Sequence, residues 1–417
     1  MVAGHLAGAA RGERERLSSS PASEATLRIV TLIVGVLCLL TVLVDAFQTI
    51  ILPRRASGPV RLTRWFYLAT WWPWRFVVQR VRNAKRREAW FSVYGPLSLI
   101  LLLAFWAATM LLGFGLIFRA LGSPIYDHEQ HVGFWSDLYV SGTAIFTMGP
   151  TDAGPLNAEA RWVMVLESGT GFGFLAVIMG YFPVLYGAFS RREVSISLLD
   201  ARAGSPPTAV ELMRRHSHED AAQALSTLLS EWERWSAELL ESHISFPLLC
   251  YFRSQHTSQS WIGALTSILD TCALLIAGVR GHEARQAQLT FAMARHAMVD
   301  LSQVISLSPM KDAPDRLPRA RYEQVYGALC QAGVSMCRDD NAETRLREMR
   351  CLYEPYAEAL SAHFCMPLPP WITDQPRKDN WLTVARVRTG AEEANPELAA
   401  AEPRPPAASL LDEHHDF

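Results

Sequence analysis

The sequence lacks the motifs by which most enzymes and metal proteins are recognised. It has no Cys-x-x-Cys pair, no Cys and His run with zinc spacing, no Gly-rich phosphate loop and no nucleophile elbow. The run His216–Asp220 is rich in potential ligands, but a helix should begin there, and acids at that point complement the helix dipole. We therefore expect no metal, no cofactor and no enzymatic activity.

Charge is scarce in three long stretches, residues 26–52, 94–121 and 161–189. A helix rises about 1.5 Å per residue, so each stretch is long enough to cross a bilayer core of about 30 Å. The first is too long for a secretory leader and is expected to remain as an anchor after the N-terminal segment 1–25. The sequence therefore predicts an all-α membrane protein with three transmembrane helices.

Positive charge is absent from residues 122–160 and concentrated in residues 53–93. The basic loop has one acid, Glu88, against ten bases: Arg54, Arg55, Arg61, Arg64, Arg75, Arg80, Arg82, Lys85, Arg86 and Arg87. By the positive-inside rule this loop is cytoplasmic, the N-terminus lies outside and residues after 190 lie inside, as expected for a multi-pass protein of the cell (inner) membrane. The outer segment carries acids that would concentrate cations at a pore mouth: Asp127, Glu129, Asp137, Asp152 and Glu159.

Tryptophans are interleaved with the bases of the cytoplasmic loop, at Trp65, Trp71, Trp72, Trp74 and Trp90. Tryptophan favours the headgroup region and arginine pairs there with anionic lipid. Residues 62–81 are therefore expected to lie on the inner membrane surface, with helix on each side of Pro73 and lipid as the partner. Nucleic-acid binding is the competing interpretation, and the adjoining spans argue against it.

A short apolar piece, Phe134–Phe146, lies between the second and third stretches and is too short to cross the membrane. It leads into Thr147-Met148-Gly149-Pro150-Thr151-Asp152 and then Gly154-Pro155. This order resembles the potassium channel family, whose filter reads threonine, aliphatic, glycine, aromatic, glycine, aspartate, and specifically its bacterial members with an extra N-terminal helix. The resemblance implies a homotetramer that passes K⁺ or other monovalent cations through a re-entrant pore helix and a filter at residues 147–152.

The sequence departs from that signature at two filter positions. Pro150 stands in place of the aromatic residue and cannot provide its bracing side chain, and Thr151 replaces a glycine that would permit a left-handed backbone. These changes favour a wider, less selective pore. They also leave open a non-conducting membrane protein that keeps the pore fold as a scaffold or sensor.

The third stretch contains helix-loosening residues and one of two intramembrane acids. Gly169 and Gly173 are candidate gating hinges or close-packing positions, and Pro183 predicts a kink. Glu167 is expected to brace the pore helix from behind. Asp45, in the first stretch, is expected to pair with Arg54 or Arg55.

Residues 190–391 show helical spacing of apolar side chains and predict a cytoplasmic helical domain that assembles or gates the pore and could bind an unknown ligand or protein. Within it, residues 261–279 are almost uncharged, but their length and hydroxyl side chains favour a buried bundle helix over a fourth crossing. Gly204-Ser205-Pro206-Pro207 predicts a hinge between the pore and the bundle. Residues 392–417, rich in Ala, Pro and acids, predict a disordered tail.

Overall fold

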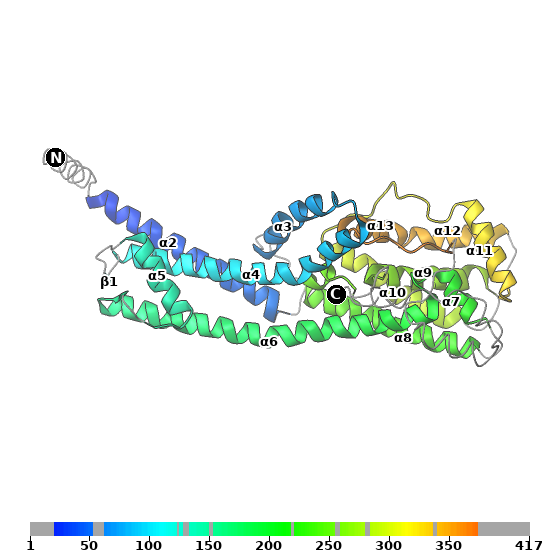
Figure 1. Cartoon of the computed structure of the whole chain (residues 1–417), viewed down its shortest axis with the longest axis horizontal. Helices are drawn as coiled ribbons and strands as arrows, with labels where there is room; N and C mark the ends of the chain where they lie inside the picture. The colour runs from blue at the N-terminus through cyan, green and yellow to red at the C-terminus, as the bar shows by residue number, and fades with distance from the viewer. Residues whose placement is uncertain are drawn as a thin grey trace, which may run out of the picture. The chain divides into compact units, whose positions relative to one another are not determined.

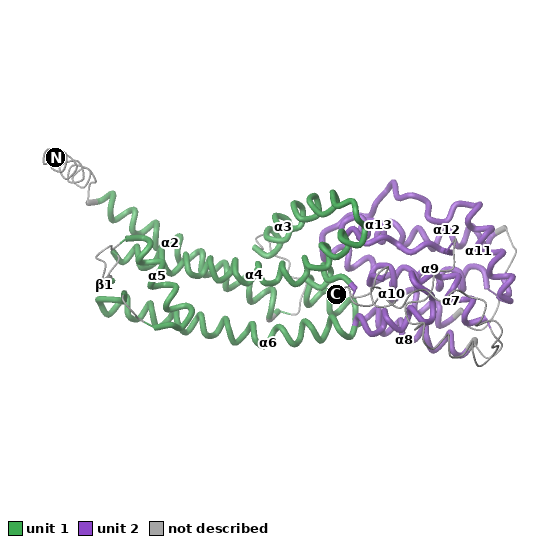
Figure 2. The backbone as a smooth tube through the Cα atoms, in the orientation of Figure 1, with its two compact units in different colours: residues 1–191, 238–253 green, residues 192–237, 254–417 purple. Residues whose placement is uncertain are grey.

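The structure is a computed structural model that describes residues 21–52, 62–122, 125–127, 133–149, 153–217, 221–254, 259–279, 284–336 and 340–373. The chain divides into two compact units (Figure 2). Unit 1 comprises residues 1–191 and 238–253, and unit 2 comprises residues 192–237 and 254–417. Residues 392–417, for which disorder was predicted, lie outside the described residues.

Unit 1 is built on long helices (Figure 1). They are α2 (Pro21–Ala46) with the π-helical turn η1 (Phe47–Ile51), α3 (Leu62–Val78), α4 (Ala84–Ala120), the short α5 (Phe134–Ile145) and α6 (Ala158–Ala203). A single antiparallel ladder joins β1 (Ile125–Asp127) to β2 (Ala153–Pro155). The end of α8 (Ala221–Ser245) and the 3₁₀ turn η2 (Pro247–Tyr251) complete the unit.

Helices α2 and α4 cross closely because both carry glycine at the contact. A methyl group at Gly35 would come within 2.7 Å of the carbonyl oxygen of Gly113, and one at Gly113 would meet the side chain of Leu39 at 2.9 Å. Near one end of the pair, the Arg28 guanidinium lies beside Gly122, just after α4. Small residues at a crossing let two backbones approach, which is how helices pack where lipid removes the hydrophobic drive.

Helix α3 runs unbroken through Pro73 and packs along the first half of α4. Trp71 contacts Phe91 and Tyr94, whose ring centroids lie 5.9 and 4.7 Å away, and Thr70 hydrogen-bonds Tyr94 at 2.9 Å. The expected helix on each side of Pro73 is present, and the two parts form one continuous helix. The aromatic face of α3 holds it against α4 as one element.

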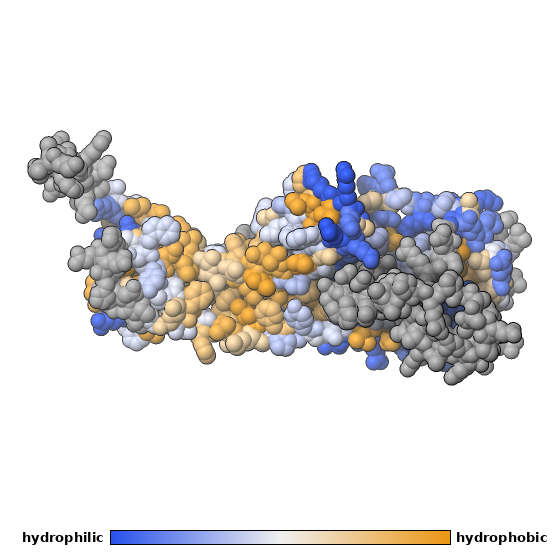
Figure 3. All heavy atoms as spheres, viewed as in Figure 1, coloured by the Kyte–Doolittle hydropathy of each residue, from blue (hydrophilic) through white to orange (hydrophobic). Residues whose placement is uncertain are grey.

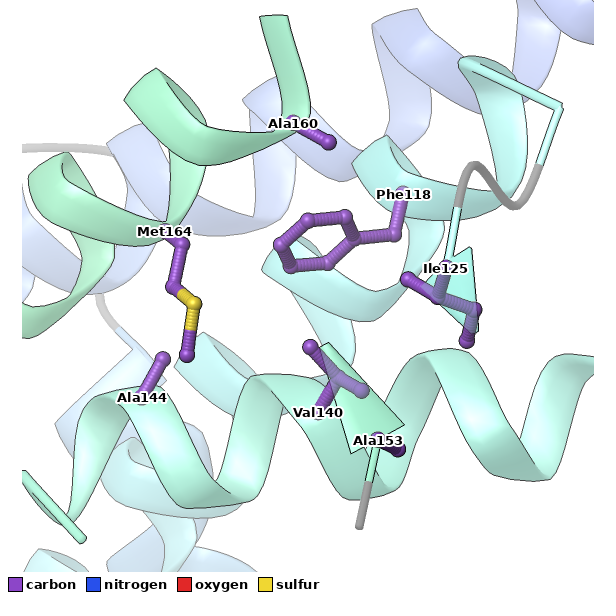
Figure 4. Close-up of a cluster of buried hydrophobic side chains, with 7 residues drawn as sticks. All are labelled: Phe118, Ile125, Val140, Ala144, Ala153, Ala160 and Met164. Carbon is purple, nitrogen blue, oxygen red and sulfur yellow. The ribbon is translucent and has the colours of Figure 1, made fainter. Parts of the chain in front are cut away.

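A small apolar core joins α4, α5, α6 and the two strands (Figure 4). The ring of Phe118 points between Met164 of α6 and Ile125 of β1, while Val140 and Ala144 of α5 close the cluster. These side chains are buried within a single copy of the chain. The core therefore fixes α5 against its neighbours.

Unit 2 contains the last turns of α6, most of α8, and α7 (Ala209–Arg215), α9 (Trp261–Gly278), α10 (Ala284–Val304), α11 (Arg319–Gln331), α12 (Asp340–Cys351) and α13 (Glu354–Phe364). Its central helix is α9, which touches α7, α10, α12 and α13. The sequence expectation of one continuous domain from residue 190 to 391 needs correction, because residues 238–253 pack with unit 1.

Four described helices are long and apolar enough to cross a membrane, and they differ in how the protein covers them. Only 11, 33 and 17 % of the apolar windows of α2, α4 and α6 are buried, compared with 94 % for α9. Orange, apolar residues form a broad surface over unit 1 (Figure 3). The first three helices thus offer apolar surface to lipid, whereas α9 is covered by protein on nearly every side.

A buried charge network ties together the C-terminal part of unit 2. Arg316 makes two hydrogen bonds to the Asp270 carboxylate, at 2.8 and 3.1 Å, and reaches Glu354 at 3.0 Å. Tyr353 donates to Asp270 at 2.5 Å. Burial disfavours the charged guanidinium, but the nearby carboxylates outweigh this effect and raise the pKa of Arg316, which therefore stays protonated.

We expect Arg316→Met to destabilise unit 2 by about 3 kcal/mol, since it leaves the buried Asp270 carboxylate without a cation, whereas Glu354 keeps its pairing with Arg350. Hydrogen–deuterium exchange of peptides from α9 and α13 should become markedly faster. Arg347→Met, which removes an exposed cation 3.7 Å from Glu343, is the matched control and should leave exchange unchanged. Equal protection in both variants would show that the network does not stabilise this unit.

Candidate pore-lining segment

The chain before α5 and the chain after it lie side by side. The strand before it pairs with the strand after the following loop, and Ile125, Tyr126 and Asp127 lie opposite Pro155, Gly154 and Ala153. The helix has 12 residues, so its length is about 18 Å, short of a bilayer core of about 30 Å. The ladder thus brings the two ends of the segment 125–155 together, and α5 between them is too short to cross such a core.

The end of α5 is a Schellman cap formed by the first filter residues. The N–H of Met148 donates to the carbonyl of Thr143 at 2.8 Å, and the N–H of Thr147 donates to Ala144 at 3.0 Å. This cap puts Thr147 at φ 57°, and Gly149 follows at φ 78°. A left-handed backbone costs a β-branched residue about 1–2 kcal/mol, so the cap holds Thr147 in a strained conformation. Pro150, Thr151 and Asp152 lie outside the described residues.

Gly171 of α6 is the point of closest approach to α5. A methyl group there would fall 2.0 Å from the carbonyl oxygen of Ile145, an impossible separation. Gly169 and Gly173, the expected hinge or packing positions, would meet nothing within 4 Å. Within one chain, therefore, neither of these two glycines makes a close contact, and Gly171 alone among the three packs against α5.

Glu167 braces α5 from α6, as the sequence suggested. Its carboxyl is fully buried and hydrogen-bonds the hydroxyl of Ser141 in the middle of α5. The same hydroxyl lies 3.0 Å from the carbonyl oxygen of Leu111 in α4. Three helices thus meet at one polar point, and the second carboxyl oxygen of Glu167 has no hydrogen-bond partner among the described residues.

Asp45 is held by helix α3 and by α4. Its carboxylate accepts hydrogen bonds from the Thr63 hydroxyl at 2.6 Å, the Thr63 N–H at 3.1 Å and the Trp106 indole at 3.0 Å. An acid beside the free N–H groups of a helix start is well placed for capping. The partners expected from the sequence, Arg54 and Arg55, lie outside the described residues.

The helix that carries Pro183 continues for 20 residues beyond it. It extends past residue 189, where the third span was expected to end, and stops at Ala203. The chain then turns at Gly204, at φ 83°. The helix is 46 residues long, or about 69 Å, so it cannot be contained within a bilayer core of about 30 Å.

One of the acids expected at the pore mouth is not a surface residue. Asp137 is fully buried, and Arg119 at the end of α4 lies 4.0 Å from its carboxylate. It occupies the first turn of α5, where a negative charge complements the helix dipole. An open acidic vestibule therefore cannot include Asp137, while Asp152 and Glu129 lie outside the described residues.

The sequence analysis did not predict that the aromatic segment after α8 is a packing element of unit 1. Tyr251 stacks on Tyr67 of α3 with ring centroids 5.0 Å apart, and Phe252 lies 5.5 Å from Phe189 of α6. Gly95 of α4 makes room for Phe252, because a methyl group there would fall 2.8 Å from its ring. The uncharged run Ile244–Phe252 was the available signal for this buried segment.

Comparison with known proteins supports membrane character and gives no activity. No protein-family model and no solved structure matches the chain. It is 22 % identical over 299 residues to the uncharacterized membrane protein YdjJ of Bacillus subtilis (strain 168), and the match covers 70 % of this chain and 84 % of that protein. The chain is a membrane protein. With the one short ladder excepted, the regular structure of its described residues is helical.

The contact at Gly171 makes a specific prediction. Gly171→Ala should separate α6 from α5 and lower the melting temperature of the detergent-purified protein by several degrees, since backbone atoms cannot yield as a flexible side chain can. Gly169→Ala and Gly173→Ala are matched controls with open space at the same helix level, and alanine has the higher helix propensity. Equal melting of all three variants would contradict this packing.

Proposed function

We propose that this protein is a subunit of a tetrameric, potassium-channel-type pore that conducts monovalent cations. The observation that carries the proposal is a short helix that ends inside the apolar part of the protein, followed by residues that a single chain leaves uncovered. The end of α5 contacts Gly171 of α6. This glycine lies 13 residues, or about 20 Å, beyond the start of α6 at Ala158.

Irregular backbone at membrane depth is tolerated only where protein buries it or where it lines a water-filled cavity. In one copy of the chain, Phe146 is 61 % exposed and Met148 is 69 % exposed, and Thr147 is exposed as well. Further copies around an axis would cover the side chains and leave the main-chain oxygens facing water. Four copies are the number that the resemblance to potassium channels implies.

The electrostatics of α5 favour a cation at that axis. The helix ends at Ile145, so the negative end of its dipole points into the apolar region, where little solvent screens it. Glu167 of α6 holds α5 in place through its hydrogen bond to Ser141. Both features would help to hold a loop of carbonyl oxygens around a partly dehydrated cation.

The charge pattern supports an inner-membrane orientation with the basic end of α3 and α4 in the cytoplasm and the β1–β2 end outside. Helix α6 would then carry any movement of the cytoplasmic bundle to the pore, because it continues without a break from Ala158 to Ala203.

A second function, a non-conducting scaffold or sensor, is favoured by the filter itself. The N–H of Thr147 is used in the cap of α5. Pro150 replaces the aromatic residue that braces a potassium filter, and Thr151 replaces the glycine that allows its backbone to bend. The two functions differ in one measurable property, the current carried by the purified protein.

Gly149→Ala should reduce or abolish current in reconstituted bilayers, since alanine is strained at the positive φ of this position. Asp152→Asn should change ion preference by removing a charge next to the filter. Gly133→Ala, at an open site with extended backbone, and Glu348→Gln, at an exposed position of α12, are the controls. Wild-type currents in both filter variants would rule out the filter assignment.

Restoring the potassium-channel signature tests selectivity. The double change Pro150→Tyr and Thr151→Gly should shift the reversal potential between potassium and sodium solutions toward potassium, because it returns a bracing aromatic and a flexible glycine. Recordings of wild type and variant in the same bilayers give the comparison. An unchanged reversal potential would count against a carbonyl-lined filter, and current in neither protein would favour the scaffold.

A further inference from the structure

We propose that α3 and the start of α4 form a binding surface for the headgroups of anionic phospholipids. Helix α3 has two opposite faces with different neighbours. Tyr67, Trp71 and Val78 are buried in unit 1, while Trp65, Leu68, Trp72 and Phe76 are 49–68 % exposed. The exposed four follow one another at spacings of three and four, so they share one face of the helix.

That exposed face continues the lipid-facing surface of α2. The hydrogen bonds from Thr63 to Asp45 place the start of α3 at the end of α2. The exposed apolar side chains of α2 run down to Phe47, which is 49 % exposed, and Trp65 begins the exposed face of α3 at 65 %. Two tryptophans just beyond the end of a spanning helix are typical of a segment at the level of the lipid headgroups.

Basic residues border this apolar face. Arg64 and Arg75 lie along one edge of the α3 stripe, and Arg80 follows the helix, with its guanidinium 3.3 Å over the ring of Phe76. Further bases begin α4, at Arg82, Lys85, Arg86 and Arg87. None of the seven forms an ion pair with a described residue, and apolar and strongly hydrophilic residues adjoin over α3 and the start of α4 (Figure 3).

The one acid of this region is already neutralised from within unit 1. Glu88 pairs with Arg253 at 2.7 Å, and the same guanidinium lies 4.7 Å from the ring of Phe91. The surface therefore keeps an excess of positive charge beside aromatic side chains. Arginine and lysine stems can extend along apolar surface while their charged ends reach phosphate, which suits a phospholipid better than a soluble anion.

The test uses the full-length protein in nanodiscs that contain equal amounts of phosphatidylglycerol and phosphatidylcholine. Trp72 is replaced by the photocrosslinker p-benzoylphenylalanine, and mass spectrometry identifies the captured lipid. The same crosslinker at Leu37, an exposed residue in the middle of α2, samples bulk lipid. We expect the ratio of phosphatidylglycerol to phosphatidylcholine at position 72 to exceed that at position 37 about fivefold, the contribution of roughly one base near a charged surface.

The triple change Arg64→Gln, Arg75→Gln and Arg80→Gln should bring the ratio at position 72 down to that at position 37. A matched triple change on unit 2, Arg285→Gln, Lys311→Gln and Arg319→Gln, removes the same charge and should leave the ratio unchanged. Unchanged melting of both triple variants verifies folding.

Three results would overturn the proposal: equal lipid ratios at positions 72 and 37 in the native background, an enrichment that survives the α3 triple change, or capture of protein or nucleic acid in place of lipid. The readout requires no current. A protein that does not conduct can still pass this test, and failure here leaves the pore proposal to be judged on its own measurements.

Discussion

The contact between α6 and the end of α5 is the constraint on which the rest of unit 1 depends. A helix that stops inside an apolar region leaves its last carbonyl groups without solvent, so a neighbour must fix them and something must cover the loop beyond. Gly171 lets α6 approach the Ile145 carbonyl. Glu167 hydrogen-bonds Ser141, which lies one helical turn before Ile145 in α5. The core around Phe118 then locks the helix from the other side.

The polar contacts of the spanning region share one feature: each joins different helices. Asp45 links α2 to the start of α3 and to Trp106, and Glu167 links α6 to α5. Buried polar groups are costly in lipid unless they find partners, so such residues define which helices can neighbour one another. In unit 2 the network around Arg316 has the same role in a protein-covered interior.

The aromatic residues of unit 1 connect the basic end of the spans to α6. Tyr251 and Phe252 belong to the segment that follows α8. They touch α3, α4 and the part of α6 around Phe189. A shift of this segment would therefore act on α3, which carries the proposed lipid-binding surface, and on α6, through the same packed rings.

The sequence by itself determined the apolar spans, the short apolar helix that begins at residue 134, the charge asymmetry and the preference for a buried helix at residues 261–279, because length, hydropathy and charge are local properties. It marked Glu167 as an intramembrane acid, but only the tertiary structure gave its partner, Ser141. Tertiary structure decided that Gly171 and not Gly169 or Gly173 packs on α5, that Asp45 caps α3 and that residues 238–253 join unit 1. Each of these depends on which distant residues meet, and periodicity along one segment contains no information about its partner.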